Sequence, residues 1–198
     1  TFGDENRLQT QGKGKTIGVA LKDRGAILPA GHAANAAYWF HGKDEAKWIT
    51  SSYYMEQLPQ WVQDFNESGI AKSYLKEWAP LKDIMTYQQS GVDRNEFEFG
   101  FDGKETADFP YDLKALAKEN GEYDLIKATP FGNDLTAEFA KAAIKGEDLG
   151  KDNVTDVLTL SFSSTDYVGH NFGVNSKEIQ DTYMRLDQNI ADVLQYLD

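Results

Sequence analysis

An aspartate and a histidine stand four residues apart, directly after an apolar run in the last quarter of the chain. The run is VLTLSF (157–162), and Asp166 and His170 follow it. Carboxylate and imidazole groups are ligands suited to Zn²⁺ or a similar divalent ion. We expect both on one short loop, which Gly169 would allow to fold tightly. A catalytic zinc usually has three protein ligands, and no third is evident. The alternative is a polar turn that holds an ordinary histidine.

A lysine and an arginine alternate where another apolar segment ends. KTIGVALKD (15–23) has the β-branched and apolar content of a short buried strand, and Lys22 and Arg24 stand at its end. Alternate residues leaving a strand point the same way. The pair could therefore hold a phosphoryl group, the arginine through its planar fork and the lysine as a point charge. The alternative is an exposed turn in which Asp23 is flanked by its own partners.

The elements that must position these residues predict an α/β fold. Strands are expected at 15–23, 36–40, 47–54 and 153–162, and helices at 58–68, 133–146 and from about 176 to the end. In sheets of this class ligands bind beyond the carboxyl ends of the strands. Asp166 and His170 stand at such a place.

The expected final helix carries the clearest pattern. Asn175 and Glu178 are spaced as a capping box. An apolar stripe follows at spacings of three and four and is expected to pack on the sheet: Ile179, Tyr183, Leu186, Ile190, Val193 and Leu197.

The middle of the chain differs from both ends. Residues 79–112 are rich in Gly, Asp and Phe, and only EFEFGF (96–101) alternates as an exposed strand does. We therefore predict a core segment at 1–50, an inserted cap at 51–125, and a second core segment at 126–198 that carries Asp166 and His170.

Composition and charge exclude several classes of function. The formal net charge of −12 argues against nucleic-acid binding through a general basic surface. No apolar run approaches the roughly 20 residues of a membrane span. Cysteine is absent, so any metal must be held by His and carboxylate. The chain opens without Met and stops inside a helical pattern, so we expect a piece of a longer protein. Such a piece could self-associate through apolar surface left bare.

Two other patterns in the sequence resemble binding sites. GKGKT (12–16) resembles a phosphate loop, but it lacks the required earlier glycine and precedes a strand. The aromatic residues between 38 and 65 are expected in the core. A saccharide-binding platform made of them is the alternative, and it would make the chain a non-catalytic ligand-binding module.

Several segments together resemble the alkaline phosphatase superfamily. They are TFGDENRLQTQGKGKTIGVALKDRGAILPAGH, ITSSYYMEQLPQWVQDFN, ATPFGNDLTAEFAKAAI and LSFSSTDYVGHNFG. The chain is most similar to the phosphate-irrepressible alkaline phosphatases, within the type I phosphodiesterase/nucleotide pyrophosphatase group. The resemblance implies an alkaline-phosphatase-like core sheet flanked by helices. It also implies a periplasmic or secreted hydrolase with two zinc ions and a threonine nucleophile that forms a covalent phosphoenzyme.

The resemblance also implies roles for the four candidate residues. Asp166 and His170 match two ligands of one zinc, and Lys22 and Arg24 match the pair that contacts phosphoryl oxygens in the monoesterase branch. The nucleophile segment, the Asp-His pair of the other zinc and a final histidine ligand have no match. We therefore predict a central fragment of a zinc-dependent phosphate monoester hydrolase, with weak metal binding and little activity alone. A phosphodiesterase, nucleotide pyrophosphatase or sulfatase-like relative is the alternative enzyme.

Overall fold

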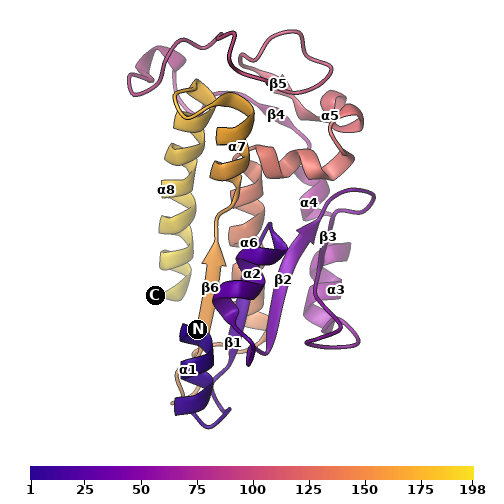
Figure 1. Ribbon diagram of the computed structural model, residues 1–198, viewed down its shortest axis with the longest axis vertical. Helices are drawn as coiled ribbons and strands as arrows, with labels where there is room; N and C mark the ends of the chain where they lie inside the picture. Colours follow the sequence, from indigo (N-terminus) through magenta and orange to yellow (C-terminus); the bar gives the residue numbers. More distant parts are fainter.

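The computed structural model describes residues 1–198 and confirms the α/β class, with one mixed sheet flanked by helices (Figure 1). The strands run in the order β3-β2-β1-β6. Their bounds are Lys47–Ile49 for β3, Ala36–His41 for β2, Thr16–Ala20 for β1 and Val157–Ser161 for β6. β1 is parallel to β2 and β6, whereas β3 is antiparallel to β2. Every residue of β1 is buried, as expected of a central strand that is covered on both faces.

One face of the sheet is covered by α2 (Asp23–Ala30). The helix lies in front of the sheet in Figure 1 and packs against β1, β2 and β6. Small residues allow this close approach, because the buried centre of the contact is formed by Ala20, Ala26 and Ala37. At Gly18 a Cβ atom would lie 2.2 Å from the carbonyl oxygen of Ala26, so only glycine fits there.

The other face carries the large core. There α6 (Phe131–Gly146) and α3 (Gln60–Glu67) cover Ile17, Val19 and Tyr38. Phe139 of α6 is the centre of an aromatic cluster. Its ring stacks on Trp48 at 4.1 Å and meets Tyr38, Trp61 and Phe65 at 5.1 to 5.5 Å. Tyr38, Phe40 and Trp48 are fully buried, so this part of segment 38–65 is core, as predicted, and offers no platform for a saccharide.

The long excursion lies over one end of the sheet, at the top of Figure 1. Its regular elements are short: α4 (Ile70–Ser73), β4 (Glu77–Trp78), η1 (Ile84–Thr86), β5 (Tyr111–Asp112), α5 (Leu113–Leu116), η2 (Ala117–Glu119) and η3 (Glu122–Ala128). The alternation at 96–101 does not correspond to a strand. Phe97 and Phe99 are exposed, and the Phe99 N–H donates to the Asn171 carbonyl instead of to a strand. The boundaries at 51 and 125 stay a prediction.

Several other boundaries differ from the sequence-based expectation, since the strand expected at 15–23 is only Thr16–Ala20 and the strand expected at 153–162 is only Val157–Ser161. The strand expected at 47–54 ends at Ile49, because Tyr53 and Tyr54 turn back and the Tyr54 N–H donates to the Ser51 carbonyl. The helix expected from Asn133 begins at Phe131, after Pro130. A further helix, α1 (Phe2–Gln9), precedes β1.

The final helix, α8 (Lys177–Leu197), forms as predicted, but its packing differs. Its cap is Ser176, whose hydroxyl accepts from the Ile179 N–H, and not Asn175. It packs mainly on α6 and on α7 (Ser164–Phe172), and only its last turns face β6, where Val193 and Leu197 line a hollow together with Leu158 and Leu160. Ile179 and Val193 of the predicted stripe are buried, whereas three others are exposed: Tyr183, Ile190 and Leu197. The self-association that such surface suggests stays a prediction. None of the helices combines the length and apolar character needed to cross a membrane.

Candidate active site

Asp166 and His170 lie on α7, not on the loop that the sequence suggested. Residues four apart share one face of a helix. The two side chains accordingly converge, with His170 Nε2 3.6 Å from Asp166 Oδ1. Gly169 makes no tight turn, since it lies inside α7, and a Cβ atom there would meet one neighbouring atom at 3.9 Å. Helical spacing, not loop flexibility, brings the pair together.

A side chain from α6 fixes the start of α7. The buried Asn133 Oδ1 accepts a hydrogen bond of 3.1 Å from the Ser164 N–H, the first residue of α7. Next to it, a Cβ atom at Gly132 would lie 2.3 Å from Ser164 Oγ. The helix that carries the Asp-His pair is therefore seated tightly against α6. The sequence pattern predicts only that Asn133 stands at the start of its own helix, so it gives no sign of this contact with α7.

Strand register brings Lys22 to the same place. Ala20 of β1 pairs with Ser161 of β6, so the carboxyl ends of these parallel strands are level. Lys22 follows β1, and its Nζ donates to Asp166 Oδ2. The hydrogen bond from Lys22 lowers the pKa of Asp166, and the positive charge of the lysine acts in the same direction. The Lys22 ammonium also lies 4.4 Å from the centre of the Tyr167 ring.

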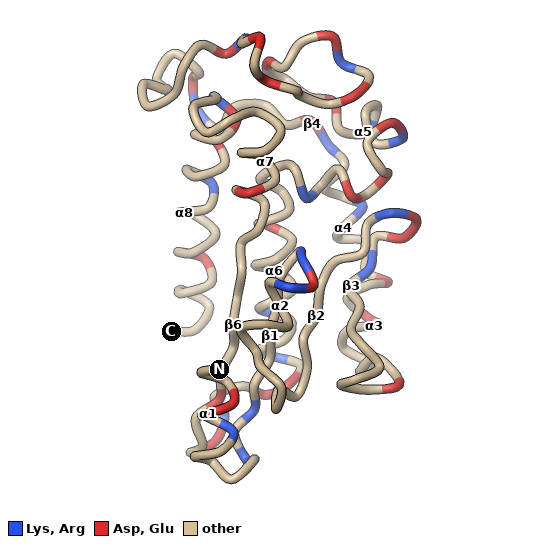
Figure 2. The backbone as a smooth tube through the Cα atoms, in the orientation of Figure 1, with Lys and Arg blue, Asp and Glu red and all other residues tan.

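Arg24 does not leave a strand together with Lys22, because β1 ends at Ala20 and Arg24 already belongs to α2. It is exposed and joins none of the chain's ion pairs. Asp23 binds the backbone N–H of Arg24 at 2.7 Å, which leaves the guanidinium free. Figure 2 shows the charged start of α2 beside the end of β6.

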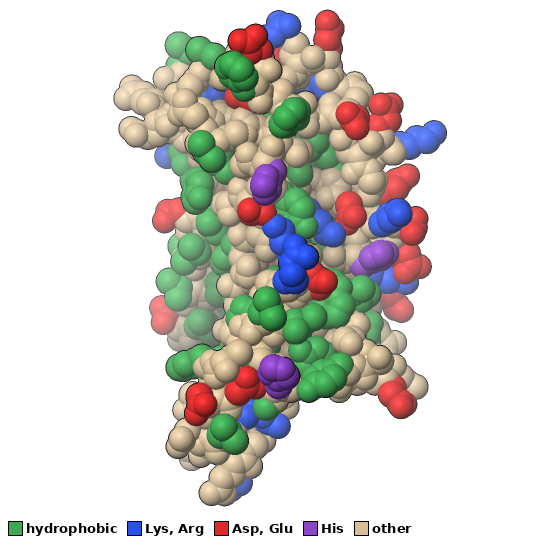
Figure 3. All heavy atoms as spheres, viewed as in Figure 1, with side chains coloured by type: hydrophobic (Ala, Val, Ile, Leu, Met, Phe, Trp, Pro, Cys, Tyr) green, Lys and Arg blue, Asp and Glu red, His purple; other side chains and the backbone are tan.

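Lys22 and Arg24 line one hollow of about 400 Å³. Its other walls come from the ends of three more elements and include His41, Lys127 and Tyr167. Basic side chains gather near the centre of this face in Figure 3. Since the whole chain has a formal net charge of −12, this gathering of cations favours an anionic ligand at this end of the sheet.

Asp166 and His170 suit a zinc ion by donor type and exposure. Their side chains are 52% and 78% exposed, so both can reach a ligand. They supply two donors, however, and no group of three or more His, Asp or Glu side chains is arranged to hold a metal. The pair therefore fits as part of a zinc site, and any further ligand must come from outside these residues.

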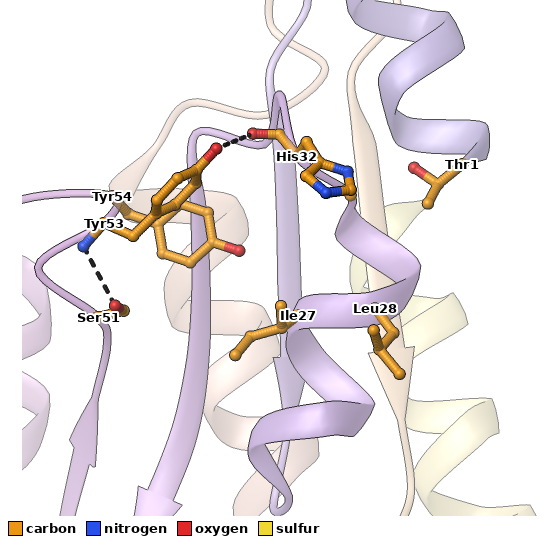
Figure 4. A pocket seen from close by; sticks show the side chains of 8 residues that line it. Thr1, Ile27, Leu28, His32, Ser51, Tyr53 and Tyr54 are labelled. Atoms are coloured by element: carbon orange, nitrogen blue, oxygen red, sulfur yellow. Dashed lines mark hydrogen bonds between the residues drawn. The ribbon is translucent and has the colours of Figure 1, made fainter.

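A separate hollow of about 320 Å³ lies at the opposite end of α2 (Figure 4). Ile27, Leu28 and Tyr54 form its apolar side, and Tyr53 donates from its hydroxyl to the His32 carbonyl at 3.0 Å. No Lys, Arg, Asp or Glu side chain lines it. It therefore suits neither a phosphate nor a metal and takes no part in the candidate site.

The family model described as type I phosphodiesterase/nucleotide pyrophosphatase matches residues 3–198. The chain belongs to this family. It is 55% identical to a protein of Myroides odoratus named calcium-transporting ATPase and 47% identical to alkaline phosphatase PhoV of Synechococcus elongatus. Both alignments cover 100% of this chain and 36% of the relative. The comparison with PhoV and the family match support a hydrolase of the phosphatase or phosphodiesterase type.

A solved structure shows the same fold. The crystal structure of alkaline phosphatase PafA, an enzyme of Elizabethkingia meningoseptica, matches with a TM-score of 0.94 and 46% sequence identity. The match covers 99% of this chain and 38% of the PafA chain. The predicted alkaline-phosphatase-like fold is therefore confirmed. Because this chain spans little more than a third of its relatives, the activity of the whole protein is a matter for proposal.

Three lining residues were not singled out by the sequence. His41 ends β2. The expectation that ligands bind beyond the carboxyl ends of the strands, which pointed to Asp166, could therefore also have pointed to His41. Tyr167 directly follows Asp166, but only the structure shows the Lys22 ammonium over its ring. Lys127 comes from η3, in a stretch without clear periodicity, and no sequence signal marked it.

Proposed function

We propose that this chain supplies the phosphoryl-binding cations and part of one zinc site of a phosphate monoester hydrolase that works through a covalent phosphoenzyme. One observation carries the proposal: the Lys22 ammonium binds one oxygen of Asp166, while His170 lies 3.6 Å from the other. A cation for phosphoryl oxygens and two metal ligands thus meet at the carboxyl ends of neighbouring parallel strands.

Each residue has a separate task. Lys22 and Arg24 balance charge on the non-bridging phosphoryl oxygens, which is where stabilisation is needed in phosphoryl transfer. Asp166 and His170 hold zinc, and a zinc ion when bound supplies Lewis-acid stabilisation of a reacting oxygen. Tyr167 holds the Lys22 ammonium over its ring, so that the lysine stays at the mouth of the site.

The threonine nucleophile, the ligands of a second zinc and the third ligand of the first are proposed to lie in the longer protein. Whole relatives are almost three times as long as this chain, which supports that division. On its own the chain should bind zinc weakly and turn over little substrate. A periplasmic or secreted location is part of the same proposal and follows from the resemblance alone.

Two cations beside the phosphoryl group favour monoesters over diesters. A monoester dianion carries one more charged non-bridging oxygen than a diester, and the free guanidinium of Arg24 is available to it. The family also includes phosphodiesterases by name, so the diester is the competing substrate. Faster turnover of a diester than of its matched monoester would favour that reading.

The metal assignment is tested by titrating the chain with Zn²⁺ while the imidazole signals of its three histidines are followed by NMR. We expect His170 to shift, and His32 and His41 to stay unchanged and serve as internal controls. Asp166→Asn should weaken zinc binding at least tenfold, since it removes a charged ligand. Shifts of His32 or His41 in place of His170 would contradict the assignment.

The competing ion pair offers a second readout of the same site. Lys22 already binds Asp166, so a zinc ion must displace it. Lys22→Met should therefore tighten zinc binding, whereas Lys141→Met, which removes a lysine paired with Glu138 and Asp192, should leave it unchanged. Unchanged zinc affinity in Lys22→Met would show that the lysine and the metal do not share Asp166.

A further inference from the structure

The hollow beside Lys22 and Arg24 is larger than a phosphoryl group requires. We propose that it binds the leaving group of the substrate and that Lys127 selects small phosphate monoesters whose leaving group carries a second phosphate. This inference rests on the proposed function, because it assumes that the reacting phosphoryl group sits at Lys22 and Arg24.

Two hollows meet at the contact between Lys22 and Asp166. One, of about 330 Å³, is lined by Asp166, His170 and the apolar side chains of Val174 and Ile179, and it contains no lysine or arginine. The other, of about 400 Å³, is lined by Lys22 and by further cations. The first hollow thus contains the two proposed zinc ligands, whereas the second offers fixed cations of the chain to a leaving group that carries negative charge.

Lys127 is the cation of this hollow that the reacting phosphoryl group does not need. Its side chain is only 15% exposed and is fixed by an ion pair of 2.7 Å to Asp124. Asp124 is itself held, because the same oxygen accepts from the Gly42 N–H at 3.0 Å. An ammonium group has three N–H donors, and the ion pair uses one of them. Lys127 can thus donate to a ligand without leaving its partner.

Charge balance in the hollow is positive once a metal holds Asp166. Lys22, Arg24 and Lys127 contribute three positive charges, and Asp23 and Asp124 contribute two negative ones. The Asp23 carboxylate already accepts from the Arg24 N–H. Because both carboxylates already have partners, the groups left to bind a ligand in the hollow are its cations.

Of the Trp, Phe and Tyr rings that line the hollow, two are already occupied by cations. A base would need a bare ring face on which to stack. The Tyr167 ring already carries the Lys22 ammonium at 4.4 Å, and the Phe40 ring carries Lys127 at 5.8 Å. Phe40 is also only 1% exposed. Trp39, the third ring, is partly exposed and carries no cation, so the preference for a second phosphate rests on the cations of the hollow.

The test uses two non-hydrolysable ligands that differ by one anionic group, propylphosphonate and propane-1,3-diphosphonate. Both are titrated into the 198-residue chain, and backbone amide shifts give the dissociation constants. The diphosphonate is expected to bind at least roughly fivefold tighter. Lys127→Met should abolish this preference and leave the affinity for propylphosphonate unchanged.

Two further variants separate charge from structure. Asp124→Asn keeps the Lys127 ammonium and removes its partner, so the preference for the diphosphonate should persist. Lys141 is a matched control, since it is 17% exposed and also paired with carboxylates, but lies elsewhere. Lys141→Met should change neither affinity.

The outcomes distinguish this inference from the proposed function. If propylphosphonate binding is lost in Lys22→Met but Lys127→Met keeps the preference for the diphosphonate, the role of Lys127 is wrong and the phosphoryl site stands. Equal affinities of the chain without substitutions for propylphosphonate and propane-1,3-diphosphonate would also overturn the inference. If neither ligand binds, or if Lys22→Met binds both as before, the proposed function falls and the inference falls with it.

Discussion

Asp181→Asn is expected to lower the free energy of unfolding by roughly 3 to 6 kcal/mol. The Asp181 carboxylate of α8 is fully buried. Its Oδ2 accepts from Trp78 Nε1 at 2.8 Å and from Arg185 Nε at 2.7 Å. Its Oδ1 accepts from the Leu81 N–H at 2.7 Å and from the Tyr87 hydroxyl. The network thus ties the excursion at 78–87 to the final helix.

The magnitude follows from counting lost acceptors. An amide keeps one oxygen and turns an NH₂ group toward two of the four donors, so two hydrogen bonds to a charged group are lost at about 1.5 to 3 kcal/mol each. Breaking a buried ion pair through one partner has a similar cost, about 3 to 5 kcal/mol. Because domains of this kind are stable by about 5 to 15 kcal/mol, the loss should be obvious.

The measurement is urea unfolding followed by circular dichroism. Asp187→Asn is the control, since Asp187 is an exposed aspartate of the same helix. The control should change the free energy of unfolding by less than about 0.5 kcal/mol. A loss below about 1 kcal/mol for Asp181→Asn, with an unchanged slope against urea, would show that the four contacts do not hold the excursion in place.

Three further changes probe the scaffold. Burial raises the pKa of Glu178 from 4.5 to about 8, so between these pH values the folded chain keeps a proton that the unfolded chain releases. The free energy of unfolding should therefore fall by up to about 1.4 kcal/mol per pH unit from pH 4.5 to 8. Glu178→Gln should flatten that decline in unfolding experiments across this range. Gly18→Ala should cost at least about 2 kcal/mol in thermal unfolding, because its Cβ would meet a backbone oxygen of α2 at 2.2 Å, and an unchanged midpoint would refute the close packing. Asn133→Ala should cost about 1 kcal/mol and speed amide exchange at the start of α7, and unchanged exchange there would deny its capping role.

The sheet and the long helices could be predicted because their signals are local. The run at 157–162 is apolar along its length, and the spacing in the last helix repeats every three or four residues, so each pattern indicates one element. The position of Asp166 and His170 after a strand was enough to place them at the ligand-binding end of the sheet. Their helix was missed because Gly169 and the polar residues around it resemble a turn.

The rest depends on contacts between distant segments. The face that α8 buries includes Glu178, Asp181 and Thr182, which hydrophobic spacing reads as solvent-facing. Asp181 is buried because it meets donors about 100 positions earlier in the chain. Lys127 reaches the hollow through an irregular segment for the same reason. Local periodicity carries no information about such pairings.

The most direct test of the central claim compares one monoester with its matched diester in a longer protein that contains this chain. The substrates are p-nitrophenyl phosphate and methyl p-nitrophenyl phosphate, which share a leaving group. Lys22→Ala and Arg24→Ala should each lower kcat/KM for the monoester by about 100-fold or more, and that for the diester at least tenfold less. Lys141→Ala should change neither. Equal losses on the two substrates, or no loss on the monoester, would contradict the claim that these cations hold the extra charged oxygen of a phosphate monoester.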